Sequence, residues 1–229
     1  MNAPDAEYER MLATRTAHLN ELVAHLAMGW DDERRKLARQ LHDTLGSTLT
    51  ALTMHLGLLN QRLPDDPALL ERSAQMKKLL MNMVEANRAL QASLWNDKLE
   101  FLGIKVALAE LAGEFAQRSG LRASASLPEG DIDCPREHAV LLLRCAEEGL
   151  RNAEAHAQAS ALELVVDDGA DALLLTVRDN GIGPPRFDPE AANCHGLRLL
   201  RERAAYFGGT LVLANAPDGG AALTLTLPK

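Results

Sequence analysis

The sequence predicts an α+β protein in which an N-terminal helical hairpin precedes a mixed layer of helices and strands. Leucines recur at helical spacing over the first part of the chain, and the segment Pro64–Pro67 interrupts that pattern once. Beyond Asn96, short alternating runs typical of strands appear between helical segments. We therefore expect a helical domain over residues 1–98 and a second domain over residues 99–229.

Length and composition exclude several classes of protein. The 229 residues are 47% hydrophobic and 24% charged, which is typical of a globular protein with a sizeable core. The net charge of −8 and the scarcity of aromatic residues argue against direct nucleic-acid binding. Cys134, Cys145 and Cys194 are odd in number and lack C-x-x-C spacing, so neither a disulfide framework nor a thiolate zinc site is expected. Since no signal segment or membrane-spanning run is apparent, we predict a cytoplasmic location.

The first helical segment is expected from Glu7 to Leu63. Its leucines form an apolar stripe at steps of three, four or seven residues, with one longer step of eleven between Leu26 and Leu37: Leu12, Leu19, Leu22, Leu26, Leu37, Leu41, Leu45, Leu49, Leu52, Leu56, Leu59 and Leu63. After Gly29, the acids Asp31 and Asp32 are suited to cap a fresh helical start. The segment is therefore predicted as one long or once-interrupted helix.

A second helix is expected from Leu69 to Leu94, where apolar and small residues step alternately by four and three. The prolines of the segment Pro64–Pro67 end the first helix and leave room only for a tight turn. The two helices must then lie antiparallel, and a hairpin alone leaves apolar surface uncovered. We expect two chains to pair into a four-helix bundle, and the alternative is cover from the C-terminal half of the same chain.

The remaining elements are predicted from changes in periodicity. In chain order they are a hinge at Trp95–Gly103, a helix at Lys105–Arg118, a strand at Leu121–Leu127, a helix at Pro135–Ala157, strands at Ala161–Val166 and Ala172–Val177, a loop at Asp179–Cys194, a helix at Gly196–Phe207, and strands at Thr210–Leu213 and Ala222–Leu227.

Two motifs in this half bear groups that suit nucleotide binding. Glu148 and Asn152 lie four residues apart on one helix face, where an amide oxygen can ligate Mg²⁺ and a carboxylate can orient a metal-bound water. Asp179 follows an apolar strand and can accept the exocyclic amine of adenine, while Gly181 and Gly183 let the backbone pass close to a planar ring. Each motif taken singly is equally typical of an exposed helix face or an ordinary turn.

A third motif, Gly196 with Leu197, opens a helix after the glycine- and proline-rich loop. The first turn of a helix presents free N–H groups and the positive end of the helix dipole, so phosphate groups bind there. Simple helix capping is the alternative interpretation. The three motifs occur in a fixed order within a short stretch, which favours one shared site.

The stretch from Ala139 to Pro228 resembles the Bergerat-type ATP-binding domain of histidine kinases, type II topoisomerases and Hsp90-class chaperones. EEGLRNAEAHA resembles the asparagine box of that domain and VRDNGIG its adenine-binding box, while the sequence from His195 onward resembles its final helix and strand pair. The resemblance implies an α/β sandwich that binds ATP and Mg²⁺, with Asn152 as metal ligand and His156 near the phosphates.

The segment DDERRKLARQLHDTLGSTLTAL, Asp31–Leu52, is similar to the phosphoacceptor helix of two-component histidine kinases of the nitrate-sensor-like subfamily. The resemblance implies that His42 receives the γ-phosphoryl group of ATP. A neutral imidazole with a pKa near 6.5 is a competent nucleophile, and the carboxylate of Asp43 can fix its tautomer and take its proton. The phosphoryl group would then pass to an aspartate of a response regulator, by analogy one with a helix-turn-helix output domain.

Three positions depart from the family pattern. Ser47 stands where the subfamily often has a glutamine that places water for phosphatase activity, Ala221 replaces a threonine hydroxyl near the adenine, and Cys194 replaces a glycine of the loop. These departures imply weaker phosphatase activity, weaker ATP binding and a stiffer loop. They also leave an alternative function, a non-catalytic dimeric module that binds a response regulator and has a degenerate ATP site.

Overall fold

The computed structural model describes residues 3–184 and 195–229. The chain divides into two compact units. One consists of Gly29–Asp97, and the other combines Met1–Met28 with Lys98–Lys229. Among the described helices, none combines the length and the apolar character that crossing a bilayer requires.

The first helix, α1 (Ala3–Leu41), continues through Gly29 and Asp31 without a break. Of the two alternatives, one long helix or one interrupted at Asp31, the structure shows the uninterrupted helix at this position. A single glycine costs a helix only about 1 kcal/mol, and no neighbouring proline removes a backbone N–H. The irregularity lies further along, where a π-helical turn, η1 (His42–Gly46), joins α1 to α2 (Ser47–Asn60).

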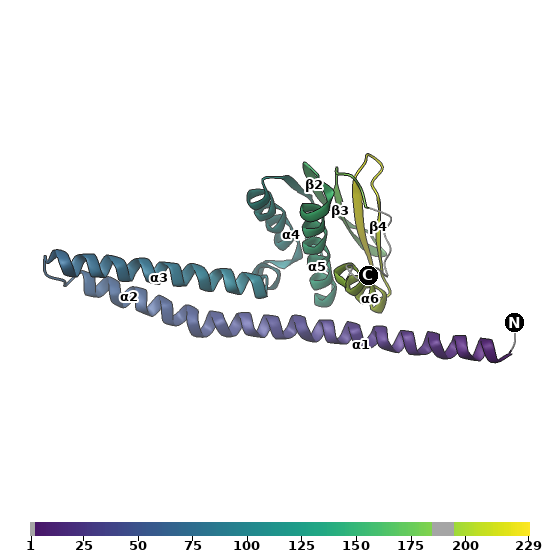
Figure 1. Cartoon of the computed structure of the whole chain (residues 1–229), viewed down its shortest axis with the longest axis horizontal. Coiled ribbons are helices and arrows are strands. Elements are labelled where there is room, and N and C mark those ends of the chain that lie inside the picture. Colours follow the sequence, from purple (N-terminus) through teal and green to yellow (C-terminus); the bar gives the residue numbers. More distant parts are fainter. Residues whose placement is uncertain (1–2, 185–194) are drawn as a thin grey trace. The chain divides into compact units, whose positions relative to one another are not determined.

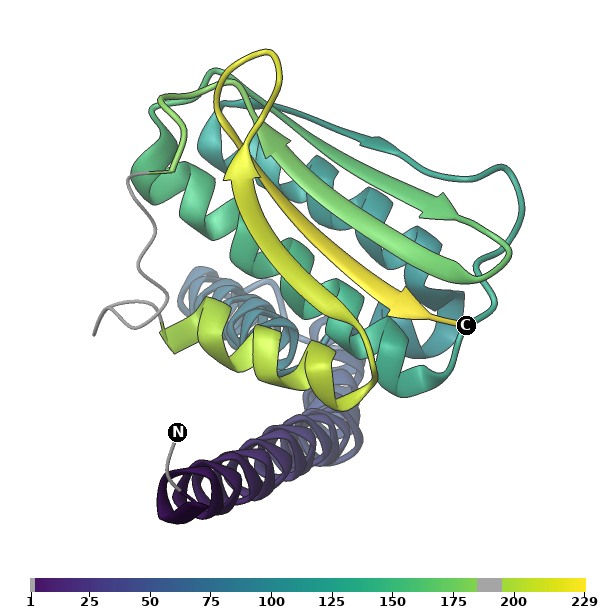
Figure 2. The ribbon, with the colours of Figure 1, turned by 90° about the vertical axis from the view of Figure 1, so that its right-hand side faces the viewer.

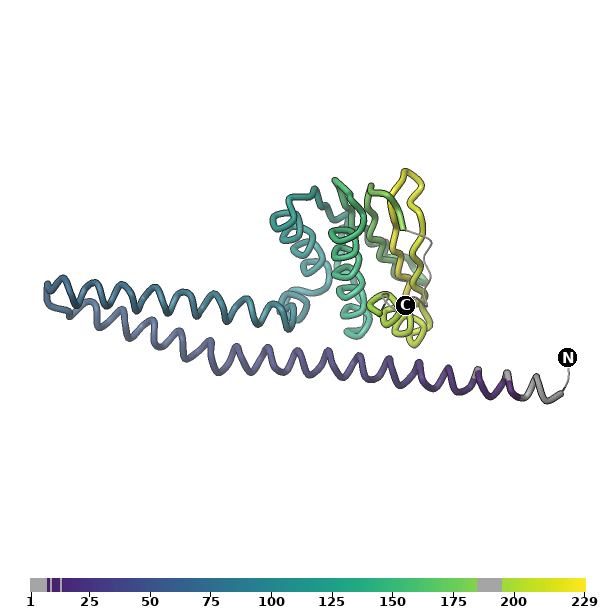
Figure 3. Tube along the Cα trace, in the orientation of Figure 1, coloured from purple at the N-terminus to yellow at the C-terminus, as the bar shows by residue number. Residues whose placement is uncertain are grey.

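Helix α3 (Pro67–Leu94) begins where the two prolines predicted a new element. The Asp66 side chain accepts a hydrogen bond from the N–H of Ala68 at 2.9 Å, and Pro67 occupies the first turn, where a missing N–H costs nothing. Helices α2 and α3 run side by side in opposite directions (Figure 3). The predicted helical hairpin is therefore present. The chain leaves α3 at Trp95, which has an extended backbone with φ −152° and ψ 142°.

The second unit contains a mixed five-stranded sheet with the strand order β1-β2-β3-β5-β4. Strands β1 and β2 are parallel, and the other neighbours are antiparallel. Its elements in chain order are α4 (Asp97–Ser119), β1 (Arg122–Ser126), α5 (Arg136–Asn152), the π-helical turn η2 (Ala153–Ala157), β2 (Ala161–Asp168), β3 (Ala172–Asp179), α6 (His195–Tyr206), β4 (Thr210–Asn215) and β5 (Ala221–Pro228). Within α4, Gly103 has a non-helical backbone with φ 80° and ψ 172°, so two helical segments meet there at a kink.

Helices α4, α5 and α6 lie on the same face of the sheet (Figures 1 and 2). Alternate residues of β2, β3 and β5 point toward these helices, and they form apolar rows across the sheet, since Leu164 lies opposite Val177 and Val177 opposite Leu223. The predicted fold class, a helical region followed by an α/β domain with a mixed sheet, is confirmed. The alternation of apolar residues in the sequence places β2, β3 and β5 to within two residues at each end.

Gly149 marks the closest approach of α5 to the sheet. A Cβ atom at this position would lie 2.9 Å from Cβ of Val177 on β3. Glycine is therefore required because the helix backbone packs directly against the β-branched side chain.

We expect Gly149→Ala to destabilise this unit by about 1–3 kcal/mol, because overpacking outweighs the better helix propensity of alanine. Gly113→Ala in α4 is the matched control, since a Cβ there meets no atom within 4 Å. That control should be neutral or slightly stabilising. Chemical denaturation of both variants measures the free energy of unfolding, and equal stability of the two would contradict the packing described for α5.

Candidate functional site

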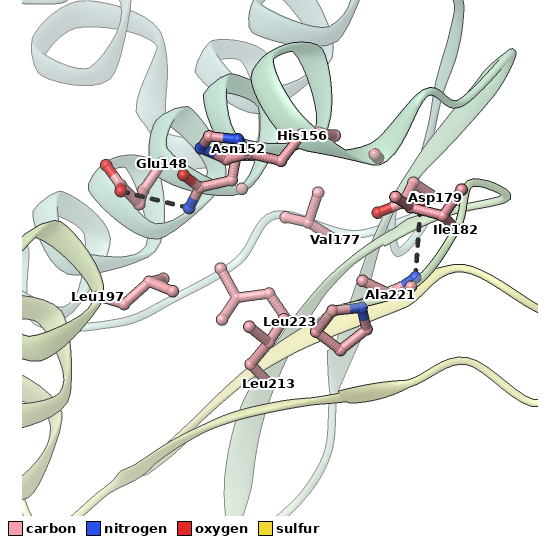
Figure 4. Close-up of a pocket in the computed structure, with 15 residues that line it drawn as sticks. Glu148, Asn152, His156, Val177, Asp179, Ile182, Leu197, Leu213, Ala221 and Leu223 are labelled. Atoms are coloured by element: carbon pink, nitrogen blue, oxygen red, sulfur yellow. Dashed lines mark hydrogen bonds between the residues drawn. The ribbon is translucent and has the colours of Figure 1, made fainter. Parts of the chain in front are cut away.

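A cavity of about 550 Å³ lies among α5, η2, the first turn of α6 and strands β3, β4 and β5. This volume is within the range of roughly 300–1,000 Å³ that is common for small-molecule sites. Figure 4 shows Asp179 at one end of the cavity and Glu148 and Asn152 at the other, with Val177 and Leu223 between them. An apolar floor with polar groups at both ends suits a ligand that has a flat heterocycle at one end and charged groups at the other.

Asp179 is held at the end of β3 by backbone hydrogen bonds. Its Oδ1 accepts the N–H of Gly181 at 2.8 Å and the N–H of Ala221 at 3.2 Å. Its Oδ2 makes no hydrogen bond to the described residues, so this oxygen is left to accept a hydrogen bond from a ligand. A carboxylate oxygen fixed in this way suits an exocyclic amine such as that of adenine.

In the loop after Asp179, Asn180 and Gly181 make contacts that hold the loop against neighbouring elements. The side chain of Asn180 points back to β2, where its Oδ1 accepts the N–H of Ser160 at 2.9 Å and that of Ala161 at 3.0 Å. Gly181 packs so closely on the carbonyl group of Ala157 that a Cβ would overlap it. The D-N-G sequence therefore forms an ordinary turn, which was the alternative interpretation of this motif, and the same turn also fixes the position of the Asp179 side chain.

At the other end of the cavity, the amide Nδ2 of Asn152 donates to Oε1 of Glu148 at 3.3 Å. Oε2 of the same carboxylate forms an ion pair with Arg151. These contacts leave the amide oxygen of Asn152 for a cation. Among the described residues, no cluster of three or more His, Cys, Asp or Glu side chains could hold a metal. The residues therefore fit Mg²⁺ that takes its other oxygen ligands from phosphates and water.

His156 and Leu197 line the same cavity, the first from η2 and the second from α6. Gly196 has a role that the sequence did not reveal. A Cβ there would overlap the carboxylate of Glu148, so this glycine lets the first turn of α6 approach α5. Gly183 also lines the cavity. Cys194 and most of the loop predicted at Asp179–Cys194 lie outside the described residues, so the expected stiffening at Cys194 has no structural account.

Cys145 is buried in α5, and burial raises the pKa of its thiol to about 12. The group therefore stays protonated at neutral pH and is not a nucleophile.

His42 lies in the helical unit and is exposed to solvent. It opens the π-helical turn η1, whose backbone carbonyl groups accept hydrogen bonds from side chains. Hydroxyl groups of the following turn bond to several of these carbonyls: Ser47 donates to Asp43, and Thr48 donates to Thr44 at 2.7 Å. The Ser47 hydroxyl is thus bonded to its own helix. Nδ1 of the His42 ring lies 3.4 Å from Oε1 of Gln91 on α3.

Comparisons with known proteins match both halves of the chain. Residues 33–97 match a family described as histidine kinase, and residues 137–229 match the family of histidine kinase-, DNA gyrase B- and HSP90-like ATPases. The two matches together cover more than half of the chain and coincide with the His42 helices and the cavity domain. The chain belongs to the histidine kinase family. Within it, the chain falls in the nitrate/nitrite-sensor-like subfamily, as the resemblance implied.

Several curated relatives of this histidine kinase are bacterial sensors. The chain is 30% identical to sensor histidine kinase MctS of Rhizobium johnstonii over 97% of this chain and 48% of that protein. It is 29% identical to the signal transduction histidine-protein kinase/phosphatase UhpB of Salmonella typhimurium, over 97% of this chain and 44% of the relative. It is also 29% identical to the nitrate/nitrite sensor protein NarX of Escherichia coli, over 85% of this chain and 32% of the relative. The chain thus spans less than half of the length of these relatives.

The histidine kinase cavity brings together six of the residues proposed from the sequence: Glu148, Asn152, His156, Asp179, Gly183 and Leu197. Gly181 and Gly196 contribute by close packing, the first on Ala157 and the second on Glu148. Two contacts were not predicted from the sequence. Asn180 ties its loop to the start of β2 through a hydrogen bond from the N–H of Ser160, and Gln91 contacts His42. The first could have been suspected from the D-N-G turn, whereas the second depends on how α2 and α3 align.

Proposed function

We propose that this protein binds ATP in the cavity, transfers the γ-phosphoryl group to His42, and passes it on to an aspartate of a response regulator. The observation that carries this proposal is the cavity itself, in which Asp179 and Asn152 lie at opposite ends of one apolar floor. An adenine amine at Asp179 and phosphates near Asn152 and the first turn of α6 satisfy both ends at once.

The chain's own groups supply positioning more than covalent chemistry, as is usual for phosphoryl transfer. Asn152 would hold Mg²⁺ together with the phosphates, and the ion supplies neutralisation of the phosphate charge. Glu148 orients the Asn152 amide through the 3.3 Å hydrogen bond. His42 provides the nucleophilic ring nitrogen, and Asp43 is the adjacent carboxylate that takes a proton.

Transfer requires the cavity to meet His42, and the segment Trp95–Gly103 supports the proposed hinge. Trp95 has an extended backbone, and Gly103 has a φ of 80° that side-chain-bearing residues rarely adopt. Two non-helical points only eight residues apart give the linker the freedom that such a movement needs.

Exposed apolar side chains support a homodimer built on the hairpin. Leu45, Leu52 and Leu59 of α2 are each about half exposed and lie seven residues apart. The same spacing recurs on α3 in a set of exposed residues, Leu69, Met76, Met83 and Leu90. Two matching heptad stripes are the pattern that a second copy covers in a four-helix bundle.

We expect Leu52→Glu to weaken the dimer at least about a hundredfold, because each dimer would bury two charges in place of two leucines. Met54→Glu is the control, since Met54 is also exposed on α2 but lies off the stripe. Light scattering over a dilution series measures the dissociation. A Leu52→Glu protein that remains as dimeric as the Met54→Glu protein would contradict this interface.

Phosphotransfer profiling tests the proposed function. The protein is incubated with Mg²⁺ and ATP labelled on the γ-phosphate, and purified response regulators of the source genome are then added one at a time. We expect rapid loss of label from the kinase to one regulator, of the class with a helix-turn-helix output domain. Tight binding of a regulator without any labelling of either protein would support the non-catalytic docking module instead.

A further inference from the structure

Gln91 is buried where an apolar residue would be expected. It is 7% exposed and lies on the face of α3 that also buries Ser73 and Asn87. A buried amide lowers stability unless its polar atoms find partners, so a leucine or methionine would fit such a position at less cost. The hydrogen bond between the Gln91 amide oxygen and the His42 ring explains why an amide is buried at this position.

The hydrogen bond to Gln91 determines which ring nitrogen of His42 is free. The amide oxygen of Gln91, 3.4 Å from Nδ1 of His42, can only accept. Nδ1 must therefore carry the proton, and the lone pair remains on Nε2. If the amide were turned to donate to Nδ1, the proton would lie on Nε2 and neither nitrogen would be nucleophilic.

The Asp43 carboxylate does not replace this contact. Within the described part of the chain it forms no hydrogen bond with the His42 ring, although we expected it to fix the tautomer. Its own backbone carbonyl is engaged by Ser47. The orienting role therefore falls to Gln91, while Asp43 keeps the role of proton acceptor that is proposed above.

We propose that Gln91 is a positioning residue that holds His42 in the Nδ1–H tautomer, so that Nε2 accepts the phosphoryl group. The inference rests on the proposed kinase function. The Nε2 lone pair forms the new N–P bond while the bond from the γ-phosphorus to the bridging oxygen breaks, and its electron pair leaves on ADP. The ring becomes an imidazolium whose Nδ1–H is bonded to Gln91, and that proton then leaves to Asp43.

The direct test is the tautomer of His42, observed by nitrogen NMR of the full chain labelled at its histidines. The His42 signals are assigned by their loss in His42→Gln. We expect the Nδ1–H form in the wild type and a shift toward the Nε2–H form in Gln91→Met, which keeps the volume but removes the acceptor. Gln75→Met is the control, because Gln75 lies on the same helix and its side chain donates to the exposed Glu71 at 3.3 Å, away from His42.

Kinetics provide the second readout. Gln91→Met should lower kcat for autophosphorylation about tenfold with KM for ATP unchanged, and Gln91→Glu, which keeps an acceptor, should restore most of the rate. A wild-type ring in the Nε2–H form, or a tautomer that is the same in Gln91→Met, would overturn the role of Gln91. An Nδ1–H ring that never becomes phosphorylated would instead reject the kinase function and leave the positioning contact intact.

Discussion

His42→Gln should abolish autophosphorylation while ATP binding stays at the wild-type level. The acceptor nitrogen is lost, whereas the described lining of the cavity comes from residues 148–223, far along the chain from His42. Glutamine suits the position because it is polar, favours a helix and preserves the exposed surface of the turn. Label retained from γ-labelled ATP and heat on titration with ATP measure the two properties separately.

His55→Gln is the matched control for this variant. His55 is exposed on α2 and has no proposed role, so its loss should leave labelling unchanged. If His42→Gln retained label at the rate of His55→Gln, another residue would be the acceptor and the hairpin would have a different function.

Asp179→Asn should weaken ATP binding about 10- to 100-fold, which is the usual worth of a hydrogen bond to a charged group. The oxygen of the new side chain would stay on the N–H groups of Gly181 and Ala221, because these donors need an acceptor. The amide NH₂ would then face the adenine amine, so two donors would meet.

Asp168→Asn is the control that shows whether loss of a carboxylate outside the cavity also weakens ATP binding. Asp168 ends β2 as Asp179 ends β3, but it pairs with Lys229 at 2.6 Å and does not line the cavity. Calorimetric titration with ATP and Mg²⁺ should give a wild-type Kd for Asp168→Asn. Equal affinities for the two variants would show that the base binds away from Asp179.

The sequence is most informative where one local rule determines the structure. The prolines at 64 and 67 placed the hairpin turn, and alternating apolar residues placed β2, β3 and β5. Asp179 was proposed as a binding residue because it lies at the carboxyl end of an apolar strand, and the structure places it in the cavity. These features depend on neighbours in the chain, so periodicity and turn chemistry are sufficient to predict them.

Features that depend on distant packing were not predictable. The π-helical turn at His42 was missed, and Asp31 was the position considered for a fresh helical start. Capping residues signal such a start only where the preceding helix ends, and α1 does not end there. Gln91 reaches His42 only because α2 and α3 align in one register across the hairpin. Gly196 fits against Glu148 only once α5 and α6 are packed.

The identity of the phosphorylated residue decides whether His42 is the phosphoryl acceptor. The protein is incubated with ATP and Mg²⁺, digested at alkaline pH to preserve phosphohistidine, and its peptides are examined by fragmentation mass spectrometry. We expect one added phosphoryl group, located on the ring of His42. A phosphoryl group on any other residue, or none on a protein that binds ATP, would contradict it.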